Sequence, residues 1–122
     1  MIDVRDVSPE VAARAMAGLS RLDARGLLTE ADLLPMCQES RCVRVSGEQG
    51  AAVLALIERN GVLWVEAAQA EGETTRMTDL LDDVLTQSGA ASIAFMTQRR
   101  GLVRRALARG YRVTGYVLKK DK

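Results

Sequence analysis

Histidine is absent from the 122 residues, and cysteine, proline and aromatic residues are scarce. Without histidine, the chain can form neither a Ser-His-Asp triad nor a Cys-His pair, and a structural zinc site loses a usual ligand, so we expect no metal. The two cysteines, Cys37 and Cys42, are too few for a disulfide framework, and we interpret both as reduced thiols that pack in the core. Because aromatics make up only 3% of the chain, no base-stacking platform is visible, which argues against a nucleic-acid partner.

Long hydrophobic runs are also missing. No apolar run approaches the roughly 20 residues that a membrane-spanning helix needs, and no charged-then-apolar leader follows Met1. We therefore expect a cytoplasmic protein with no membrane partner. With 48% hydrophobic residues, the chain has enough apolar material for one core, so we treat residues 1–122 as a single domain. The net charge of +1 favours no class of partner.

The stretch around which the chain is organised spans residues 50–85. Asn60-Gly61 lies between two apolar runs of strand length, and a type I′ hairpin turn needs two residues that accept positive φ. The sequence therefore predicts two antiparallel strands joined at this turn. Residues 69–74 (QAEGET) then predict a polar loop that leads into an amphipathic helix, whose N-terminus offers free backbone N–H groups to an anion. The apolar residues of that helix are Met77, Leu80, Leu81, Val84 and Leu85.

The N-terminal residues predict a strand followed by a helix. Residues 2–7 alternate apolar and charged side chains, as a half-buried strand does. Ser8-Pro9 then supplies an N-cap with proline at the first helical position. We expect this helix to end before Gly26 and to bury four residues of one face: Val11, Ala15, Leu19 and Leu22.

The remaining elements follow from similar signals. Thr29, with Asp32 three residues later, predicts the start of a second helix, which Pro35 limits to about two turns. Residues 42–48 alternate as a strand, and residues 91–98 predict an interior strand because they are apolar on both faces. A helix that starts at Arg99 or Arg100 and runs to Ala108 is ended by Gly110, and residues 111–120 predict the last strand. The order β-α-α-β-β-β-α-β-α-β indicates an α/β fold with a mixed, mostly antiparallel sheet.

This order, and the residues at three places in it, resemble the GNAT superfamily of acyl-CoA N-acyltransferases. Members carry Arg/Gln-x-x-Gly-x-Gly/Ala between the fourth strand and the following helix, and residues 69–74 match all but the last position. The family's terminal strand, helix, Gly-aromatic pair and final strand are similar to residues 92–98, 102–109, Gly110-Tyr111 and 112–120. The third place is the hairpin that feeds directly into the loop.

The resemblance implies a sheet that splays open between the strands near residues 62–68 and 91–97, with the pantetheine arm of acetyl-CoA in the gap. The amides of that arm would bond to the backbone of the fourth strand, and the pyrophosphate would take N–H groups from the loop and the start of the next helix. The residues that the resemblance assigns to acetyl-CoA are Ala67, Ala68, Gln69, Ala70, Gly72, Thr74, Thr75 and Arg76.

The implied activity is N-acetylation, in which a primary amine of a small molecule or a protein attacks acetyl-CoA directly. Glu66 and Glu58 are candidate general bases that act through water, although outward-facing strand residues would give the same pattern. Members often carry a tyrosine that protonates the leaving thiolate, but that position is Ala106 here. Tyr111, at the family's Gly-aromatic position, is the candidate that remains.

Departures from the family pattern keep an alternative open. Glu71 and Glu73 flank Gly72, where a carboxylate would repel a diphosphate, and Arg99 occupies the position of a frequent asparagine. The alternative is the same fold kept as a non-catalytic interaction or structural module, for example a phage or accessory protein.

The charges are distributed unevenly along the chain. The stretch after Gln98 is strongly basic, whereas the acids gather between residues 66 and 83. The basic end is open to three interpretations: a solvated helix face, a site for CoA phosphates or another anionic partner, or a nucleic-acid surface. A free strand edge after Leu118 also makes a homodimer an expectation.

Overall fold

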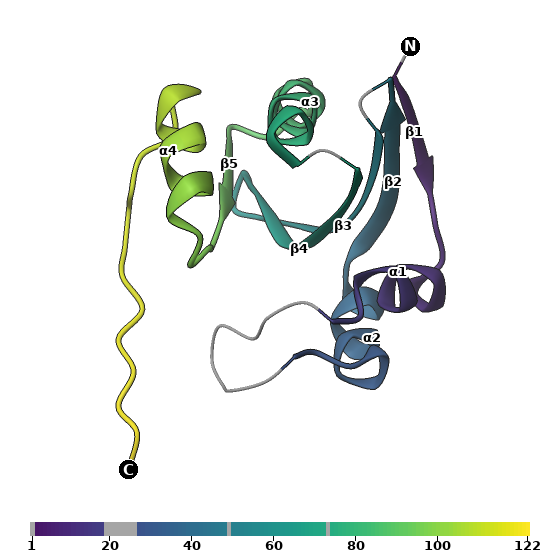
Figure 1. The fold of residues 1–122 in the computed structure, drawn as a ribbon, viewed down its shortest axis with the longest axis horizontal. Coiled ribbons are helices and arrows are strands. Elements are labelled where there is room, and N and C mark those ends of the chain that lie inside the picture. The colour runs from purple at the N-terminus through teal and green to yellow at the C-terminus, as the bar shows by residue number, and fades with distance from the viewer. Residues whose placement is uncertain (1, 19–26, 49, 73) are drawn as a thin grey trace.

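The computed structural model describes residues 2–18, 27–48, 50–72 and 74–122 (Figure 1). Within these ranges the chain is a mixed α+β protein with a five-stranded mixed sheet and four helices. The elements in chain order are β1 (Asp3–Asp6), α1 (Pro9–Met16), α2 (Glu30–Glu39), β2 (Arg41–Gly47), β3 (Gly50–Arg59), β4 (Val62–Gly72), α3 (Thr74–Thr86), β5 (Ser92–Phe95) and α4 (Arg100–Ala108).

The sheet keeps the strands in chain order, β1-β2-β3-β4-β5. The first four strands are antiparallel neighbours, and β5 pairs in parallel with the start of β4. The predicted hairpin is confirmed: Arg59 pairs with Val62 across the turn, and both turn residues have positive φ, 53° at Asn60 and 80° at Gly61. The parallel step needs a crossover, which α3 supplies.

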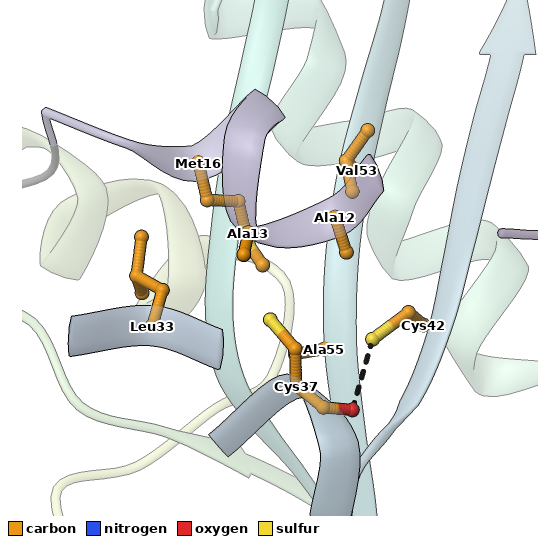
Figure 2. Packing of buried hydrophobic residues seen from close by; sticks show 8 residues of the cluster. All are labelled: Ala12, Ala13, Met16, Leu33, Cys37, Cys42, Val53 and Ala55. Atoms are coloured by element: carbon orange, nitrogen blue, oxygen red, sulfur yellow. Dashed lines mark hydrogen bonds between the residues drawn. The ribbon is translucent and has the colours of Figure 1, made fainter. Parts of the chain in front are cut away.

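Buried side chains fill both faces of this sheet. On one face, α1 and α2 cover β3, and Figure 2 shows Met16 and Leu33 from the two helices close to the sheet residues. On the other face, α3 places Leu80 and Leu85 against β2 and β3. In Figure 1, α3 and the pair α1 and α2 accordingly lie on opposite sides of the strands. The sheet is therefore the middle layer of the fold.

Both cysteines are buried free thiols, as the sequence indicates. They lie side by side in the cluster of α1, α2 and β3, and the Cys42 thiol donates a hydrogen bond to the Cys37 carbonyl oxygen at 3.4 Å (Figure 2). Burial, followed by the proximity of Cys42, raises the pKa of the Cys37 thiol to about 11. A thiol held in this way is a packing residue that stays protonated at neutral pH.

The prediction for the inward face of α1 is wrong in its register. Val11 is 51% exposed, whereas Ala12, Ala13 and Met16 are fully buried. Of the predicted residues, Ala15 is partly buried and packs against this cluster, so the true face is rotated from the predicted one toward Ala12 and Ala13. Small side chains let α1 approach α2 and β3 closely, so these alanines face the core. Leu19 and Leu22, assigned to the same face, lie outside the described residues.

For helix α2, the predicted N-terminal capping box is confirmed, but the predicted length is wrong. The Thr29 side chain accepts from the Asp32 N–H at 3.1 Å, and the Asp32 carboxylate accepts from the Thr29 N–H at 2.9 Å, so the capping box is complete. However, Pro35 lies inside the helix, which continues to Glu39. Proline deprives the carbonyl of Ala31 of its usual donor, and because both residues are exposed, water can take that place.

Two predicted boundaries in the second half are also wrong. Residues 69–72 are not a loop, because β4 stays paired with β3 as far as Gly72 opposite Gly50. Alternation of side chains along QAEG suits a strand as well as a loop, and the long partner strand β3 decides between them. Residues 111–120 do not form a strand; they extend past α4 without joining the sheet (Figure 1). No helix among the described residues is long and apolar enough to cross a membrane.

Candidate functional site

An opening beside the sheet lies beyond the end of β5, where β4 continues without this neighbour. The parallel pairing of the two strands covers Val62–Val65 of β4 and the whole of β5, Ser92–Phe95, after which β4 continues to Gly72 paired only with β3 on its other side. Beyond this point a cleft of about 590 Å³ lies between β4, α3, the residues after β5 and α4. We call this space the β4–β5 cleft. Its volume falls within the roughly 300–1,000 Å³ that is typical of ligand pockets.

A β-bulge in β4 lies at the mouth of the cleft. Ala67 pairs with Ala55 and Val65 pairs with Leu56, so Glu66 is an extra residue with no partner in β3. Glu66 is exposed as a whole although its side chain is only 26% exposed, so its main chain must account for much of that exposure. A bulge of this kind redirects backbone groups at the position where the two strands part.

The predicted backbone ligands Ala67, Ala68, Gln69 and Ala70 all line the β4–β5 cleft. In an antiparallel pair, alternate N–H and C=O groups point away from the partner strand, and beyond Val65 no strand covers that side of β4 in the described part of the chain. The residues that were expected to form a phosphate-binding loop therefore present the free edge of a strand instead.

The other predicted ligands lie at the end of β4 and the start of α3. Gly72 pairs with Gly50, and Thr74, Thr75 and Arg76 form the first turn of α3. The structure describes their backbone as strand and helix, whereas their side chains, and Glu73 entirely, lie outside the described part.

The two candidate bases have different surroundings. Glu66 lines the cleft, and its Oε1 atom lies 3.1 Å from the Arg59 guanidinium, which holds the carboxylate at the mouth. Glu58 is an exposed residue of β3 near the hairpin turn, and it does not line the cleft. The structure thus brings one of the two carboxylates to the cleft residues.

Tyr111 lies in the cleft as part of a cluster that joins α3 to the end of α4. Its hydroxyl donates to Asp82 Oδ1 at 2.8 Å, and its ring meets Phe95 edge-on with the centroids 5.5 Å apart. Burial, followed by this hydrogen bond to Asp82, raises the pKa of the Tyr111 phenol well above its usual value of 10. The phenol therefore remains a proton donor throughout the neutral range.

Arg109 neutralises the acidic side of this cluster. Its Nε donates to Asp82 Oδ2 at 2.9 Å, its second nitrogen pairs with Asp83, and Asp79 lies 3.8 Å away. These hydrogen bonds raise the pKa of the Arg109 guanidinium. Among the described residues, no group of histidine, cysteine or acidic side chains is arranged to hold a metal ion.

Arg105 is a site residue that the sequence prediction missed. It lines the cleft from α4, and its Nε atom is buried without a hydrogen-bond partner in the described structure. Arg99, which also lines the cleft, is exposed and forms no ion pair with a described acid. In the sequence both were members of a basic stretch, and only the fold separates them from Arg104, which is exposed and lies outside the cleft lining.

Glu71, one of the two glutamates beside Gly72 that were expected to repel an anion, points away from the cleft. Glu71 lies 3.6 Å from Arg44 of β2, and it does not line the cleft. Along β4 it follows Ala70, which packs on the α3 face of the sheet, so Glu71 belongs to the opposite face. The charged side chains that line the cleft are thus Glu66, Asp82, Arg99, Arg105 and Arg109.

The chain was also compared with known proteins. No protein-family model matches it, and no curated protein matches its sequence.

Proposed function

We propose that the protein is a GNAT-like N-acetyltransferase, which binds acetyl-CoA in the β4–β5 cleft and transfers the acetyl group to a primary amine. The observation that carries the proposal is the free, bulged edge of β4 over residues 66–70, which opens into a cleft of ligand size. The resemblance implies a gap between the strands near residues 62–68 and 91–97; β5 is paired with β4 along its whole length, Ser92–Phe95, and the space beside β4 begins where β5 ends.

The free edge suits the pantetheine arm of acetyl-CoA. That arm is an extended chain with two amides, and an extended ligand with amides can add to a sheet edge as a short strand would. Ala67, Ala68 and Ala70 give this edge small side chains, so the ligand can approach the backbone closely. An exposed N–H near the bulge at Glu66 would donate to the thioester carbonyl oxygen and stabilise negative charge there.

Arg105 and Arg99 provide positive charge for the phosphates or another anionic part of the ligand. An arginine with a buried, unpartnered Nε loses its hydration without gaining a bond, and an anionic oxygen would supply the missing acceptor. The pairing of Glu71 with Arg44 removes one source of repulsion near this end of the cleft.

The chemistry requires a direct attack on the thioester. The amine nitrogen forms a bond to the carbonyl carbon, the carbon–sulfur bond then breaks, and the thiolate leaves with its electron pair. Glu66 accepts the amine proton through a water molecule, and the protonated hydroxyl of Tyr111 donates a hydrogen bond toward the leaving sulfur. The buried cysteines Cys37 and Cys42 lie in the core on α2 and β2 and take no part.

A non-catalytic interaction module is the second candidate, and two contacts favour it. The Glu66 carboxylate is already paired with Arg59, and the Tyr111 hydroxyl already donates to Asp82. Both groups would have to exchange these partners during a reaction. In this case the cleft would bind an acyl-CoA or another extended ligand without turnover.

Calorimetric titration with acetyl-CoA tests the binding step. We expect the Arg105→Gln variant to weaken binding about 10- to 100-fold, because a charge-assisted hydrogen bond contributes about 1.5–3 kcal/mol. The matched control is Arg104→Gln, which removes the same charge from the exposed neighbour and should leave the affinity within about twofold.

Release of free thiol in the presence of a panel of primary amines tests the reaction. Binding with turnover supports the enzyme, and binding that Arg105→Gln weakens without any turnover supports the module. No heat of binding at about 1 mM acetyl-CoA, a ligand concentration that detects even weak sites, would overturn both forms of the proposal.

A further inference from the structure

The C-terminal segment, residues 112–122, is an extended chain that leaves the body of the protein after α4 (Figure 1). Every residue of it is exposed, and its backbone forms no strand with any other described residue. Its apolar side chains are far from buried: Val113 is 61% exposed, Val117 71%, Tyr116 90% and Leu118 93%. Large apolar side chains on an unpaired, extended backbone are characteristic of a strand that lacks its sheet.

A hollow of about 1000 Å³ separates this segment from β5 and α4. The lining includes Ser92–Phe95, the inner side of α4, and residues 112–117 and 119. Ten large apolar side chains are exposed among the described residues, and five of them line this hollow: Met96, Leu107, Val113, Tyr116 and Val117. The exposed apolar surface of the chain is therefore concentrated here, as at a site of association.

The hollow is bordered by a free sheet edge. Among the described strands β5 is the last of the sheet and pairs only with β4, so its second edge presents N–H and C=O groups without a strand partner there. In Figure 1 the segment runs in the same sense as β5, and residues of both line the hollow. A strand placed between them would pair with β5 on one side and with the segment on the other.

We propose that a second copy of this chain fills the hollow, and that two copies exchange their C-terminal segments. Each copy carries both parts of the contact, namely an extended donor strand and a free acceptor edge at β5. When two copies meet around a two-fold axis, the partner's segment lies between β5 and the C-terminal segment of the first copy. The first copy's segment in turn lies between the partner's segment and the partner's β5, so the two sheets join into one. The two-fold axis makes the partner's segment antiparallel to both neighbours, and each copy receives the contact that it gives.

Sedimentation equilibrium of the 122-residue chain over a range of concentrations tests this exchange. We expect a monomer–dimer equilibrium that the double variant Val113→Pro with Tyr116→Pro shifts toward monomer, with the dissociation constant raised at least about tenfold. Backbone N–H groups point alternately to the two sides of a strand, and Val113 and Tyr116 are an odd number of residues apart. One proline therefore removes an N–H donor toward the partner's β5, and the other removes an N–H donor toward the partner's segment.

The matched control is Asp121→Pro with Lys122→Pro, which adds two prolines beyond the apolar part of the segment and should leave the dimer intact. Because these residues are exposed and outside the core, all variants should keep the far-ultraviolet circular dichroism of the wild type at concentrations where each chain is monomeric. Hydrogen exchange at dimer concentration should show protected amides over residues 112–118 in the wild type and the control only. A chain that is monomeric at all concentrations, or a dimer that the Val113 and Tyr116 prolines do not weaken more than the control prolines, would overturn the proposal.

Discussion

The two halves of the protein differ in how completely their strands are enclosed. Residues 12–56 contribute fourteen of the seventeen buried apolar residues among those described, and only Leu80, Leu85 and Ala106 come from the later part. β2 and β3 have a strand on each side, whereas β5 has one neighbour along its four residues. The first half thus contains most of the buried core, and the elements of the second half pack at the edge of the sheet that this core supports.

β4 is the boundary between these halves and belongs to both. One of its edges is paired with β3 along nearly its whole length, and the other edge is covered only at its start by β5. A strand held firmly on one side can present its other side to a ligand without loss of the fold. The comparison teaches that the stability and the candidate site of this protein are carried by different parts of one sheet.

The largest effect should come from a substitution in the first half. Leu54 on β3 is 1% exposed and packs with Leu80 and Leu85 of α3. We expect Leu54→Ala to lower the free energy of unfolding by about 2–5 kcal/mol, from lost burial and the cavity left behind. Urea unfolding monitored by circular dichroism measures it.

Val11→Ala is the matched control for that substitution, because Val11 is 51% exposed on α1. It should change the free energy of unfolding by less than about 0.5 kcal/mol. An equal loss in the two variants would contradict both the enclosed core and the face that α1 presents to it.

A smaller effect is expected where the second half is attached. The Asp82 side chain is 14% exposed and accepts hydrogen bonds from Arg109 and Tyr111. Asp82→Ala should cost about 1–3 kcal/mol, because both donors lose a charged acceptor. In hydrogen exchange, the amides of α4 should exchange faster in this variant while those of β3 change little.

Asp83→Ala provides the comparison on the same helix, since the Asp83 side chain is 57% exposed and pairs with Arg109. Its effect should be clearly smaller than that of Asp82→Ala. If β3 and α4 lost protection together in Asp82→Ala, the two halves would unfold as one unit. That result would contradict the claim that the second half can open while the core of the first half stays folded.

The smallest effect concerns pH. Folding raises the pKa of the Tyr111 phenol above its usual value of 10, so the folded state holds this proton more tightly than the unfolded state. The resulting stabilisation is complete below pH 10 and is lost as the pH rises through the folded pKa. Stability should therefore fall more steeply above about pH 10 in the wild type than in Tyr111→Phe.

Phenolate absorbance gives an independent measurement of the same group. In a Tyr116→Phe background Tyr111 is the single tyrosine, and its titration midpoint should lie above 10. Asp82→Asn removes the charge that the hydroxyl faces and should move the midpoint downward. An unshifted midpoint with Asp82 intact would show that the phenol is not held in the cluster.

Local signals in the sequence predicted much of the first half. The Asn60-Gly61 turn and the Thr29–Asp32 capping box are each decided by a few neighbouring residues, and both are present. The buried face of α1 could not be predicted in this way, because it depends on how closely α2 and β3 approach Ala12 and Ala13. The periodicity of large residues pointed to a neighbouring face, of which Ala15 does pack against the core while Val11 is exposed.

The second half was less predictable because its elements depend on pairing over long distances. Residues 69–72 have the composition of a loop and become strand because β3 extends far enough to pair with them. The alternating pattern of residues 111–120 is that of a strand, but no strand of the described chain lies beside it. Arg105 differs from Arg104 only in the side of α4 on which it lies, which a run of basic residues does not reveal.

Hydrogen exchange of the backbone amides of β4, with and without saturating acetyl-CoA, tests the central claim most directly. The account predicts added protection over residues 66–70, no change in β1 (Asp3–Asp6), and loss of the added protection in Arg105→Gln. Unchanged exchange over residues 66–70 while acetyl-CoA is bound would contradict it, because the free edge of β4 would then not be where the ligand lies.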